Sequence, residues 1–577
     1  MDPRTAAHVL TQLAAYLELR GESRFKSKAY TQAARALVAL DTDDLASLDR
    51  EGTLAATRGI GPATLSVIRD LISTGESRYL EQLRAELPPG LIDLLRVPGL
   101  STAKIHHLHE ELDVDSVDAL ELAALDGRLA KLKGFGPKTA QRILRGIAFM
   151  RSAVSQSLYH RGAAEAHSLL AMVRAHPDVL RAEIAGSVRR HRETVGDTDI
   201  VAACSDPATT AASFARAPGV RDVRRDGPTS TSLTYADGAR LDLHCVSDRD
   251  FPLALWRATG SDAHVRLMAD RLAARGFRLV GDSLVDAGGF PVRVADEGAL
   301  YELAALSFVP PEMREGVGEL ALAEAGAIPP LVTLTDIRGA LHCHSSWSDG
   351  KATITEMVQA SRDRGWNYIG ITDHSQAAFY AGGLKPDELR EQHAEIDELE
   401  AATPGFRILK GVECDILADG RLDYDEAVLD RLDFVVASVH SRFSMDLTTM
   451  TDRVLRALDD PHLTVLGHPT GRLLLSRDAY AIDMSVVLEK AGAVGAAVEI
   501  NADPHRLDLD WRQIPEALSH GVTFEIGPDA HSTNGLDNMR FGVGIARKGG
   551  LAAGDVLNAR PVDEVLAFAR ARRAGGR

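Results

Sequence analysis

The sequence predicts a multidomain protein with an all-α N-terminal region, a central α+β region and a C-terminal α/β barrel. Its 577 residues are enough for about three or four domains. Apolar residues recur at helical spacing through residues 1–150, and strand-like runs such as 200–203 and 241–246 follow. After residue 340, strand-like runs alternate with helix-like stretches. This order of patterns determines the predicted fold class.

The composition is that of a globular protein outside the membrane. Hydrophobic residues make up 45% of the chain and charged residues 25%, a balance that argues against disorder. No charged-then-apolar leader and no membrane-length apolar run is present. The cysteines are too few and too scattered for a disulfide framework: Cys204, Cys245, Cys343 and Cys414. We therefore expect a reducing, cytoplasmic location.

The net charge of −17 is concentrated in the last part of the chain, because residues 331–577 alone carry −12. An acidic protein is a poor nucleic-acid binder unless cations gather locally. Clustered carboxylates can equally hold metal ions. Composition alone leaves both interpretations open.

Three Gly-centred turns, at 58–62, 97–101 and 133–138, each precede the start of a predicted helix. Such a turn presents unpaired backbone N–H groups and the positive end of the helix dipole to an anion. One such turn is most often an ordinary tight turn, but three in tandem resemble the helix-hairpin-helix motif, which grips DNA phosphates. The resemblance implies DNA contacts at Gly59, Gly61, Gly99, Gly134, Gly136 and Lys138.

The first 75 residues, with 25–30 ahead of 58–61, also resemble the small N-terminal domain of family X DNA polymerases. Relatives with lyase activity place a Schiff-base lysine on the helix after this hairpin. Here the matching position is Val67, which has no amine. We expect no lyase activity by that route.

Asp197 and Asp199 form an Asp-x-Asp pair in a strand-like run, so both carboxylates point to one face. Two such acids alone most often lie on a strand face that is exposed to solvent. A third acid, Asp242, lies in another strand-like run. Acids on the same face repel one another unless a divalent cation lies between them. Residues 186–190 offer backbone, hydroxyl and guanidinium donors suited to a triphosphate. Two cations held in this way lower the pKa of a primer 3′-OH and stabilise the leaving pyrophosphate.

This set resembles the nucleotidyltransferase palm of family X polymerases. The resemblance implies that the three acids are catalytic and bind two Mg²⁺ or Mn²⁺ ions. It also implies nucleotide contacts at Gly186, Ser187, Arg190, Gly196, Thr259 and Gly260. Arg257 and Ala258 replace two aromatic residues of the family pattern, and Val265 replaces an Asn. These departures bear on sugar recognition and predict weak or unusually tolerant polymerisation.

Half of the 20 histidines follow residue 340, and most lie in clusters with acidic residues directly after strand-like runs. A single histidine is most often a surface or core residue. Six such clusters at strand ends instead indicate a metal site, because the open end of a barrel collects functional groups. Because side chains alternate along a strand, the imidazoles of His342 and His344 point to one side and the Cys343 thiol points to the other. By the same alternation Cys414 points away from Glu413, so neither thiol is needed as a ligand. Neutral imidazole and carboxylate suit Zn²⁺, Mn²⁺ or Fe²⁺.

The clusters match, in order, the polymerase-and-histidinol-phosphatase (PHP) domain, which is a distorted (β/α)₇ barrel. The resemblance implies up to three Zn²⁺ or Mn²⁺ ions and phosphoester hydrolysis. One ion would be held by His342, His344, Glu413 and Asp529, a second by Asp349, His374 and His531, and a third by His440 and His468 with Glu413 bridging. Arg472 and Arg506 could clamp a substrate phosphate or form ordinary ion pairs.

The resemblance extends over nearly the whole chain and divides it into five regions. These are an N-terminal helical domain with a hairpin (1–80), a second hairpin region (81–152), a nucleotidyltransferase palm (153–252), a thumb-like region (253–328) and a PHP domain (329–577). It resembles the bacterial family X DNA polymerases with a C-terminal PHP domain. The implied function is template-directed filling of short gaps in base excision repair, with a 3′–5′ exonuclease and a potential abasic-site endonuclease. We expect a monomer near the nucleoid, with gapped or nicked DNA and dNTPs as partners.

Two alternatives remain open at this stage. The PHP domain could act on small phosphate esters while the palm is inactive, although such a phosphatase needs neither hairpins nor palm carboxylates. The chain could also be a DNA-end-binding protein, with or without exonuclease activity, whose palm is weak or inactive. The altered segment 257–265 allows that for the palm, whereas the full ligand set opposes a non-catalytic PHP domain.

Overall fold

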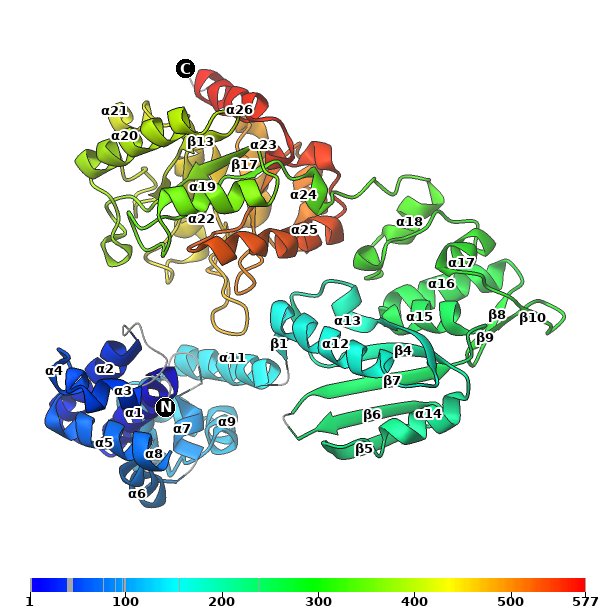
Figure 1. Ribbon diagram of the computed structural model, residues 1–577, viewed down its shortest axis with the longest axis horizontal. Coiled ribbons are helices and arrows are strands. Elements are labelled where there is room, and N and C mark those ends of the chain that lie inside the picture. The colour runs from blue at the N-terminus through cyan, green and yellow to red at the C-terminus, as the bar shows by residue number, and fades with distance from the viewer. Residues whose placement is uncertain are drawn as a thin grey trace. The chain divides into compact units, whose positions relative to one another are not determined.

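The computed structural model describes residues 3–38, 45–75, 77–88, 90–95, 97, 100–154, 156–236 and 238–575. The chain divides into two compact units, residues 1–155 and 156–577 (Figure 1). Across these described ranges, no helix combines the length and apolarity that crossing a lipid bilayer requires.

The first unit is helical throughout its described part. In α1 (Pro3–Leu19), Leu10, Leu13 and Leu17 recur every three or four residues and are fully buried, so one helix face enters the core. Residues between 6 and 83 form one hydrophobic core and residues mainly between 91 and 147 form another. The other helices are α2 (Arg24–Val38), α3 (Leu45–Arg50), α4 (Thr53–Ala56), α5 (Pro62–Thr74), α6 (Arg78–Glu86), α7 (Gly90–Leu94), α8 (Thr102–Leu112), α9 (Val117–Leu125), α10 (Arg128–Lys131) and α11 (Pro137–Val154).

The second unit begins with a five-stranded mixed sheet. Its strands lie in the order β2 (Val179–Ile184), β4 (Thr198–Cys204), β7 (Arg240–Val246), β6 (Ser230–Tyr235) and β5 (Val220–Asp226). Only β4 and β7 pair in parallel; the other neighbours are antiparallel. A short pair, β1 (Ser157–Leu158) with β3 (Thr194–Val195), and helices α12 (Tyr159–Arg174), α13 (Gly186–Arg189) and α14 (Pro207–Phe214) complete this palm region.

A smaller α+β region follows the palm. A three-stranded antiparallel sheet of β8 (Arg278–Val280), β9 (Ser283–Val285) and β10 (Pro291–Val292) accompanies several helices. Trp256, Met268 and Tyr301 are buried at its core. The helices are α15 (Phe251–Thr259), α16 (Asp262–Ala274), α17 (Glu297–Leu303), η1 (Pro311–Met313) and α18 (Glu319–Glu324).

The C-terminal region is a parallel barrel, as the alternation of strands and helices predicted. Its strands are β11 (Gly339–Ala340), β12 (Tyr368–Ile371), β13 (Arg407–Lys410), β14 (Glu413–Asp415), β15 (Val436–Ser438), β16 (Val465–Leu466), β17 (Ala497–Asn501) and β18 (Thr523–Gly527). β13 and β14 belong to one chain segment that is interrupted at residues 411 and 412, so the strands form seven segments. The strands form two parallel sheets, one of β11, β12 and β13 and one of β14 to β18. Parallel bridges from Cys343 to Ala530 and from His374 to Glu413 connect these two sheets.

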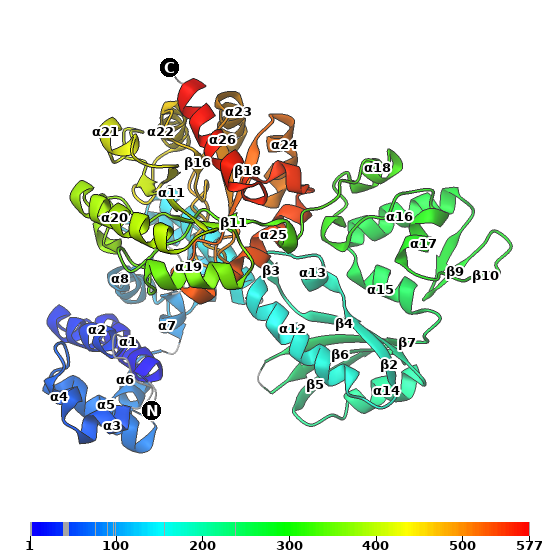
Figure 2. The same cartoon turned by 45° about the horizontal axis from the view of Figure 1, so that its top comes forward.

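Helices surround these strands, as Figure 2 shows for the helices from α19 to α26. They are α19 (Ile354–Asp363), α20 (Pro386–Ala402), α21 (Glu426–Leu429), α22 (Leu447–Asp459), α23 (Met484–Val494), α24 (Ile514–Ser519), α25 (Met539–Lys548) and α26 (Val562–Gly575). Short 3₁₀ turns lie between them: η2 (Leu334–Asp336), η3 (Phe379–Ala381), η4 (Trp511–Gln513), η5 (Thr533–Asn538), η6 (Ala553–Asp555) and η7 (Leu557–Ala559).

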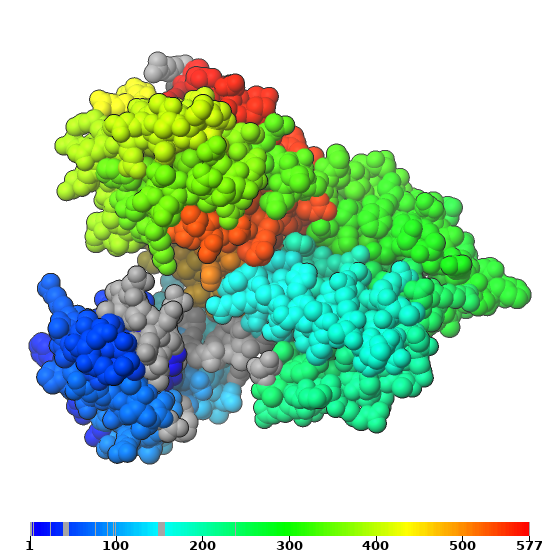
Figure 3. Space-filling view, viewed as in Figure 1, coloured from blue at the N-terminus to red at the C-terminus, as the bar shows by residue number. Residues whose placement is uncertain are grey.

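Within the second unit, α25 packs against the palm region. The Lys548 ammonium donates to the carbonyl oxygens of Arg190 at 3.0 Å and Glu312 at 3.2 Å, and also to the Glu315 carboxylate. The Arg512 guanidinium reaches Glu193 of the palm at 3.1 Å. In Figure 3 the orange surface of the barrel adjoins the cyan surface of the palm region.

Candidate active sites

The three palm acids predicted to be catalytic lie together at one edge of the sheet. Asp199 on β4 is the register partner of Asp242 on β7, and Asp197 immediately precedes β4. Burial and then the charges of Asp197 and Asp242 raise the pKa of Asp199 to about 7. Asp199 and Asp242 also line a cavity of about 210 Å³. Such mutually repelling carboxylates fit a divalent-cation site.

The predicted triphosphate turn packs directly on these acids. Gly186 has a φ of +56°, and a Cβ there would lie 1.7 Å from Oδ2 of Asp199. Glycine is therefore required for the turn to approach Asp199 this closely. Ser187 lies in α13, and its buried Oγ has no hydrogen-bond partner among the described residues. The Gly196 carbonyl next to Asp197 accepts a hydrogen bond from Arg240.

Arg190 is engaged by protein groups in this structure. Its Nε donates to Glu315 at 3.1 Å and its Nη1 donates to the Thr259 carbonyl, which leaves 13% of the side chain exposed. The neighbouring Arg189 donates to Thr259 Oγ1 at 2.6 Å, and Thr259 and Gly260 are both buried beside these arginines. The structure therefore joins the two predicted nucleotide-binding segments, while contact of Arg190 with a triphosphate stays a prediction.

The hairpin turns of the first unit are exposed and open. Gly59, Gly61, Gly134 and Gly136 are exposed, as is Lys138. A Cβ at Gly61, Gly134 or Gly136 would meet nothing within 4 Å, so the space above these turns is open to a ligand. The turns immediately precede α5 and α11. Gly99, the remaining predicted contact, lies outside the described residues.

In the barrel, Glu413 lies at the centre of the predicted metal ligands. Its carboxylate lies 2.8 Å from His468 Nε2, 2.9 Å from His374 Nδ1 and 3.2 Å from His440 Nε2. His342 and His344 approach it at 3.5 and 3.6 Å. Segments more than 100 residues apart therefore converge on one buried carboxylate.

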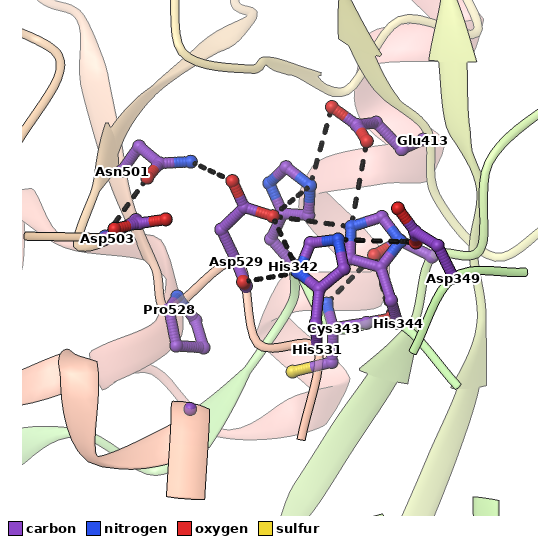
Figure 4. A network of polar contacts seen from close by, with 12 residues as sticks. His342, Cys343, His344, Asp349, Glu413, Asn501, Asp503, Pro528, Asp529 and His531 are labelled. Carbon is purple, nitrogen blue, oxygen red and sulfur yellow. Dashed lines mark hydrogen bonds and ion pairs between the residues drawn. The ribbon is translucent and has the colours of Figure 1, made fainter. Parts of the chain in front are cut away.

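Asp529 and Asp349 flank this centre. Asp529 Oδ1 lies 3.4 Å from His344 Nε2 and 3.7 Å from His342 Nε2. Asp349 Oδ1 lies 3.3 Å from His531 Nε2 and 3.6 Å from His374 Nε2. All nine predicted ligands are thus linked by contacts of under 4 Å, and Figure 4 shows six of them with their neighbours.

The donor atoms form three groups in which one ion could touch every member. The groups are His342, His344 and Asp529; His344, Asp349, His374 and His531; and His374, Glu413 and His440. They share most members with the three sets that the family resemblance implies. The structure differs by adding His344 to the second group and His374 to the third. It also leaves Glu413 out of the first group and His468 out of the third.

Several ring nitrogens of these ligands make no hydrogen bond, which leaves their lone pairs available to a metal ion. Among the described residues, the buried Nε2 of His342, both ring nitrogens of His344 and Nδ1 of His468 make no hydrogen bond. Burial, together with the neighbouring His374, lowers the pKa of His344 to about 3, which keeps this imidazole neutral and able to bind a cation. Buried imidazoles gathered around buried carboxylates therefore fit transition-metal ions.

Supporting residues that the sequence did not reveal hold these ligands. Glu499 on β17 contacts His342 Nδ1 at 2.5 Å and accepts from the backbone N–H of His468 and from the Asn501 amide. Asn501 in turn donates to Asp529 Oδ2 at 3.0 Å (Figure 4). The sequence feature that could have identified Glu499 is the presence of an acid in a strand, Ala497–Asn501, that is otherwise almost wholly apolar and buried.

Of the two arginines considered for phosphate binding, Arg472 forms ordinary protein contacts. It donates to Asp510 Oδ2 at 2.7 Å and to the Arg506 carbonyl at 3.0 Å. Arg506 instead lies beside the ligands, with its Nε 3.5 Å from Asp529 Oδ2 and 18% of its side chain exposed. Among these two, only Arg506 is placed to face a substrate phosphate.

The histidine pair His342-x-His344 differs locally from the prediction. These residues lie just after β11 rather than within a strand. The alternation nevertheless holds, because Cys343 packs in the hydrophobic core and the two imidazole centroids lie 5.3 Å apart.

Comparison with protein families supports the order of domains. A helix-hairpin-helix domain matches residues 1–77, and a SAM-like helix-hairpin-helix tandem matches residues 91–148. A DNA polymerase beta thumb matches residues 254–315, and a PHP domain matches residues 340–501.

One curated relative matches nearly the whole chain, and others match about a third of it. The chain is 37% identical to the DNA polymerase/3′-5′ exonuclease PolX of Bacillus subtilis, over 98% of this chain and 99% of the relative. A probable phosphatase of Thermoanaerobacter sp. is 28% identical over 38% of this chain and 88% of the relative. A probable phosphatase of Caldanaerobacter subterraneus is 30% identical over 31% of this chain and 70% of the relative. Since the relative from Bacillus subtilis is 37% identical over nearly the whole of both chains, this chain belongs to the PolX family, the bacterial family X DNA polymerases with a C-terminal PHP domain.

Proposed function

We propose that this protein fills short gaps in DNA by templated nucleotidyl transfer in its palm and shortens 3′ ends in its PHP barrel. The observation that supports both activities is the gathering of two separate ligand sets, Asp197, Asp199 and Asp242 in the palm and nine ligands in the barrel. Family membership over 98% of the chain favours this function over a phosphatase or a non-catalytic DNA-end binder.

In the palm, Asp197, Asp199 and Asp242 would hold two Mg²⁺ or Mn²⁺ ions beside the turn that begins at Gly186. Bound there, the ions would activate the primer 3′-OH and neutralise charge on the triphosphate. The turn contributes the unpartnered Ser187 hydroxyl and the N-terminal N–H groups of α13, which orient the incoming dNTP. Thr259 and Gly260 are buried against Arg189 and Arg190, and Gly196 precedes Asp197, so these three residues would support the groups that contact the nucleotide.

In the barrel, His342, His344, Asp349, His374, Glu413, His440, His468, Asp529 and His531 would hold up to three Zn²⁺ or Mn²⁺ ions. Bound there, the ions would activate water and neutralise the phosphoryl oxygens that it attacks. Glu413 holds the imidazoles from several strands at one point, and Arg506 faces the same space with a guanidinium that suits phosphate. The same site could act on abasic DNA.

The hairpin turns at Gly59, Gly61, Gly99, Gly134, Gly136 and Lys138 would hold the phosphates of gapped or nicked DNA without reading sequence. Because DNA is the substrate, we place the monomeric protein in the cytoplasm at the nucleoid, acting in base excision repair.

A gapped DNA with a 5′-labelled primer tests the two activities separately in Mn²⁺. We expect extension when dNTPs are present and shortening when they are absent. Asp242→Ala should abolish extension and spare shortening, because it removes one palm carboxylate. His344→Ala should do the reverse, because His344 belongs to two of the three donor groups.

Matched controls are Asp248→Ala, an exposed palm acid, and His520→Ala, an exposed histidine outside the ligand set. Both should retain both activities. If Asp242→Ala or His344→Ala remained folded but lost both activities, the assignment of separate sites would be wrong.

A further inference from the structure

Two adjacent aromatic side chains stand exposed on the loop that follows the ligand His374. Phe379 is 84% exposed and Tyr380 is 63% exposed, although both belong to the same short turn, η3. Their ring centroids lie 5.9 Å apart with an interplanar angle of 78°. Large exposed apolar side chains that adjoin one another on a soluble surface indicate a binding site.

The loop is firmly held even though these two rings are not. Ala378 and Ala381, on either side of the rings, are buried, and the Ala381 N–H donates to the Ala378 carbonyl at 2.9 Å. At the base of the loop, the Leu384 N–H donates to the His374 carbonyl at 2.8 Å. The Ala377 N–H donates to Asp423 Oδ2 at 2.7 Å. The backbone therefore presents the rings in a fixed position, which lowers the entropic cost of binding a ligand.

The loop that carries the two rings runs beside the open side of the metal-ligand cluster. The side chains of Asp349 and His531 are each 37% exposed, whereas those of His342, His344 and Glu413 are at most 1% exposed. A substrate therefore reaches the cluster past Asp349 and His531. A Cβ on Gly382 would lie 3.5 Å from the Ser348 carbonyl, so the loop runs beside the segment that carries Asp349.

Tyr380 lies within electrostatic range of the cluster. After burial, the carboxylates of Asp415, Glu413 and Asp349 are the groups that raise the pKa of its phenol, and Arg506 opposes them. The loop geometry and the electrostatic contacts therefore agree that Tyr380 lies near the ligands.

We propose that Phe379 and Tyr380 form a nucleobase-binding platform, on which the 3′-terminal base of the DNA stacks while its phosphate lies at the cluster. The base of a nucleotide is joined to its phosphate through a single sugar, so a base must lie at the rim when its phosphate is at the ligands. Aromatic rings bind any base by stacking, as a sequence-independent exonuclease requires. This inference rests on the proposed exonuclease function and specifies the part of the substrate that the site recognises beyond phosphate.

The test compares single-stranded oligonucleotides that end in a normal nucleotide or in a base-free tetrahydrofuran nucleotide. The wild-type protein in Mn²⁺ should remove the normal end about 5- to 100-fold faster in kcat/KM, the range that stacking of one base on aromatic rings supports. The double variant Phe379→Ala/Tyr380→Ala should lose this preference, with the base-free end removed at the wild-type rate. Tyr380→Phe should behave as wild type, because it keeps the ring.

Phe290→Ala is the matched control, since Phe290 is a similarly exposed aromatic (71%) outside the barrel, in the loop between β9 and β10. It should keep the full preference for the normal end. The proposal is overturned if the double variant still prefers the normal end. It is equally overturned if Tyr380→Phe loses the preference, because the hydroxyl and not the ring would then be responsible.

Binding without cleavage separates this inference from the exonuclease proposal. An oligonucleotide with 2-aminopurine at its 3′ end, mixed with protein in EDTA, should lose fluorescence on stacking with wild type and Phe290→Ala but not with the double variant. If wild type shortens neither DNA end in Mn²⁺, the exonuclease proposal fails, and the fluorescence result alone then decides the base contact. Unchanged fluorescence with wild type overturns the platform.

Discussion

At the scale of single residues, Glu499 shows how one buried side chain positions a metal site without belonging to it. One carboxylate oxygen contacts His342 Nδ1, which directs the Nε2 lone pair of that ring toward the cluster. The other accepts from the His468 N–H and from Asn501, the amide that also holds Asp529. The predicted ligands His342, His468 and Asp529, from three chain segments, thus depend on one carboxylate. Residues that hold ligands in this way orient them and tune the affinity for the metal.

Glu499→Gln tests this positioning role. A Gln side chain has only one accepting oxygen, so it cannot serve His342 and the His468 and Asn501 donors together. We expect a 3′-end shortening rate about 10- to 100-fold lower and a higher Mn²⁺ concentration for half-maximal activity. Extension by the palm should be unchanged.

Circular dichroism melting and gel assays across a Mn²⁺ titration provide the measurement. The control is Glu516→Gln, which alters an exposed glutamate of α24. A purely structural role would lower the melting temperature without shifting the Mn²⁺ requirement, and that result would refute the positioning role.

The sequence reveals ligands more readily than the residues that support them. His342, His374 and Asp529 were found because histidines and acids directly after strands form a recognisable pattern. Glu499 was missed although it is the one acid of an otherwise almost wholly apolar strand, because it lies inside the strand and the ligand pattern picks out residues that follow a strand. The pairing of Arg190 with Glu315 joins residues 125 positions apart, and no local pattern encodes such a contact.

At the scale of elements, α25 serves two sides of the second unit. One face packs on β17 and β18 of the barrel, where a Cβ on Gly542 would lie 2.5 Å from Ile526. Another face meets the palm, where a Cβ on Gly544 would lie 2.2 Å from His191 Nδ1. His191 itself follows the turn that begins at Gly186 and stacks on Tyr159 with ring centroids 4.9 Å apart. Two glycines therefore let one helix fit between the barrel and the palm.

Gly544→Val tests this close approach. The added side chain must displace His191, and such overpacking typically costs about 1–3 kcal/mol of unfolding free energy. We expect the loss in a urea denaturation curve, with partial recovery in the double variant Gly544→Val/His191→Ala.

The matched control is Gly554→Ala in η6, where a new Cβ would meet nothing within 4 Å. It should leave stability within about 0.5 kcal/mol of wild type. Equal curves for Gly544→Val and Gly554→Ala would show that α25 and the palm do not pack as described.

Strand positions were predictable because buried parallel strands form short apolar runs. The run 241–246 that the sequence indicated forms β7 with one further residue, Arg240, and the run 200–203 lies within β4. The placement of His342 and His344 after β11 was not predictable, because alternation continues in the extended chain beyond the last ladder hydrogen bond. The interruption between β13 and β14 was also not predictable, because hydrophobic periodicity does not show where a strand is broken.

At the scale of the whole molecule, we expect bound metal ions to stabilise one of the two units and not the other. The order of helical, palm, thumb and barrel regions followed from sequence texture and family motifs, and family comparison supports it. Which regions pack against one another did not follow, because the contacts depend on single charges such as Lys548 and Glu315. Both predicted metal sites lie in residues 156–577, and none of the predicted ligands lies in residues 1–155.

Metal removal should therefore destabilise the second unit alone. A ligand that binds only the folded state adds about 2.7 kcal/mol at a free concentration 100-fold above its dissociation constant. We expect Mn²⁺ added to EDTA-treated protein to raise the unfolding temperature and to slow amide hydrogen exchange in segments 340–344, 411–415 and 527–531, while exchange in residues 100–150 is unchanged. His344→Ala should lose most of this protection and Asp242→Ala should keep it, since the barrel ligands are the more deeply buried set. Equal protection of both units, or full protection in His344→Ala, would show that the barrel cluster is not the principal metal site of the chain.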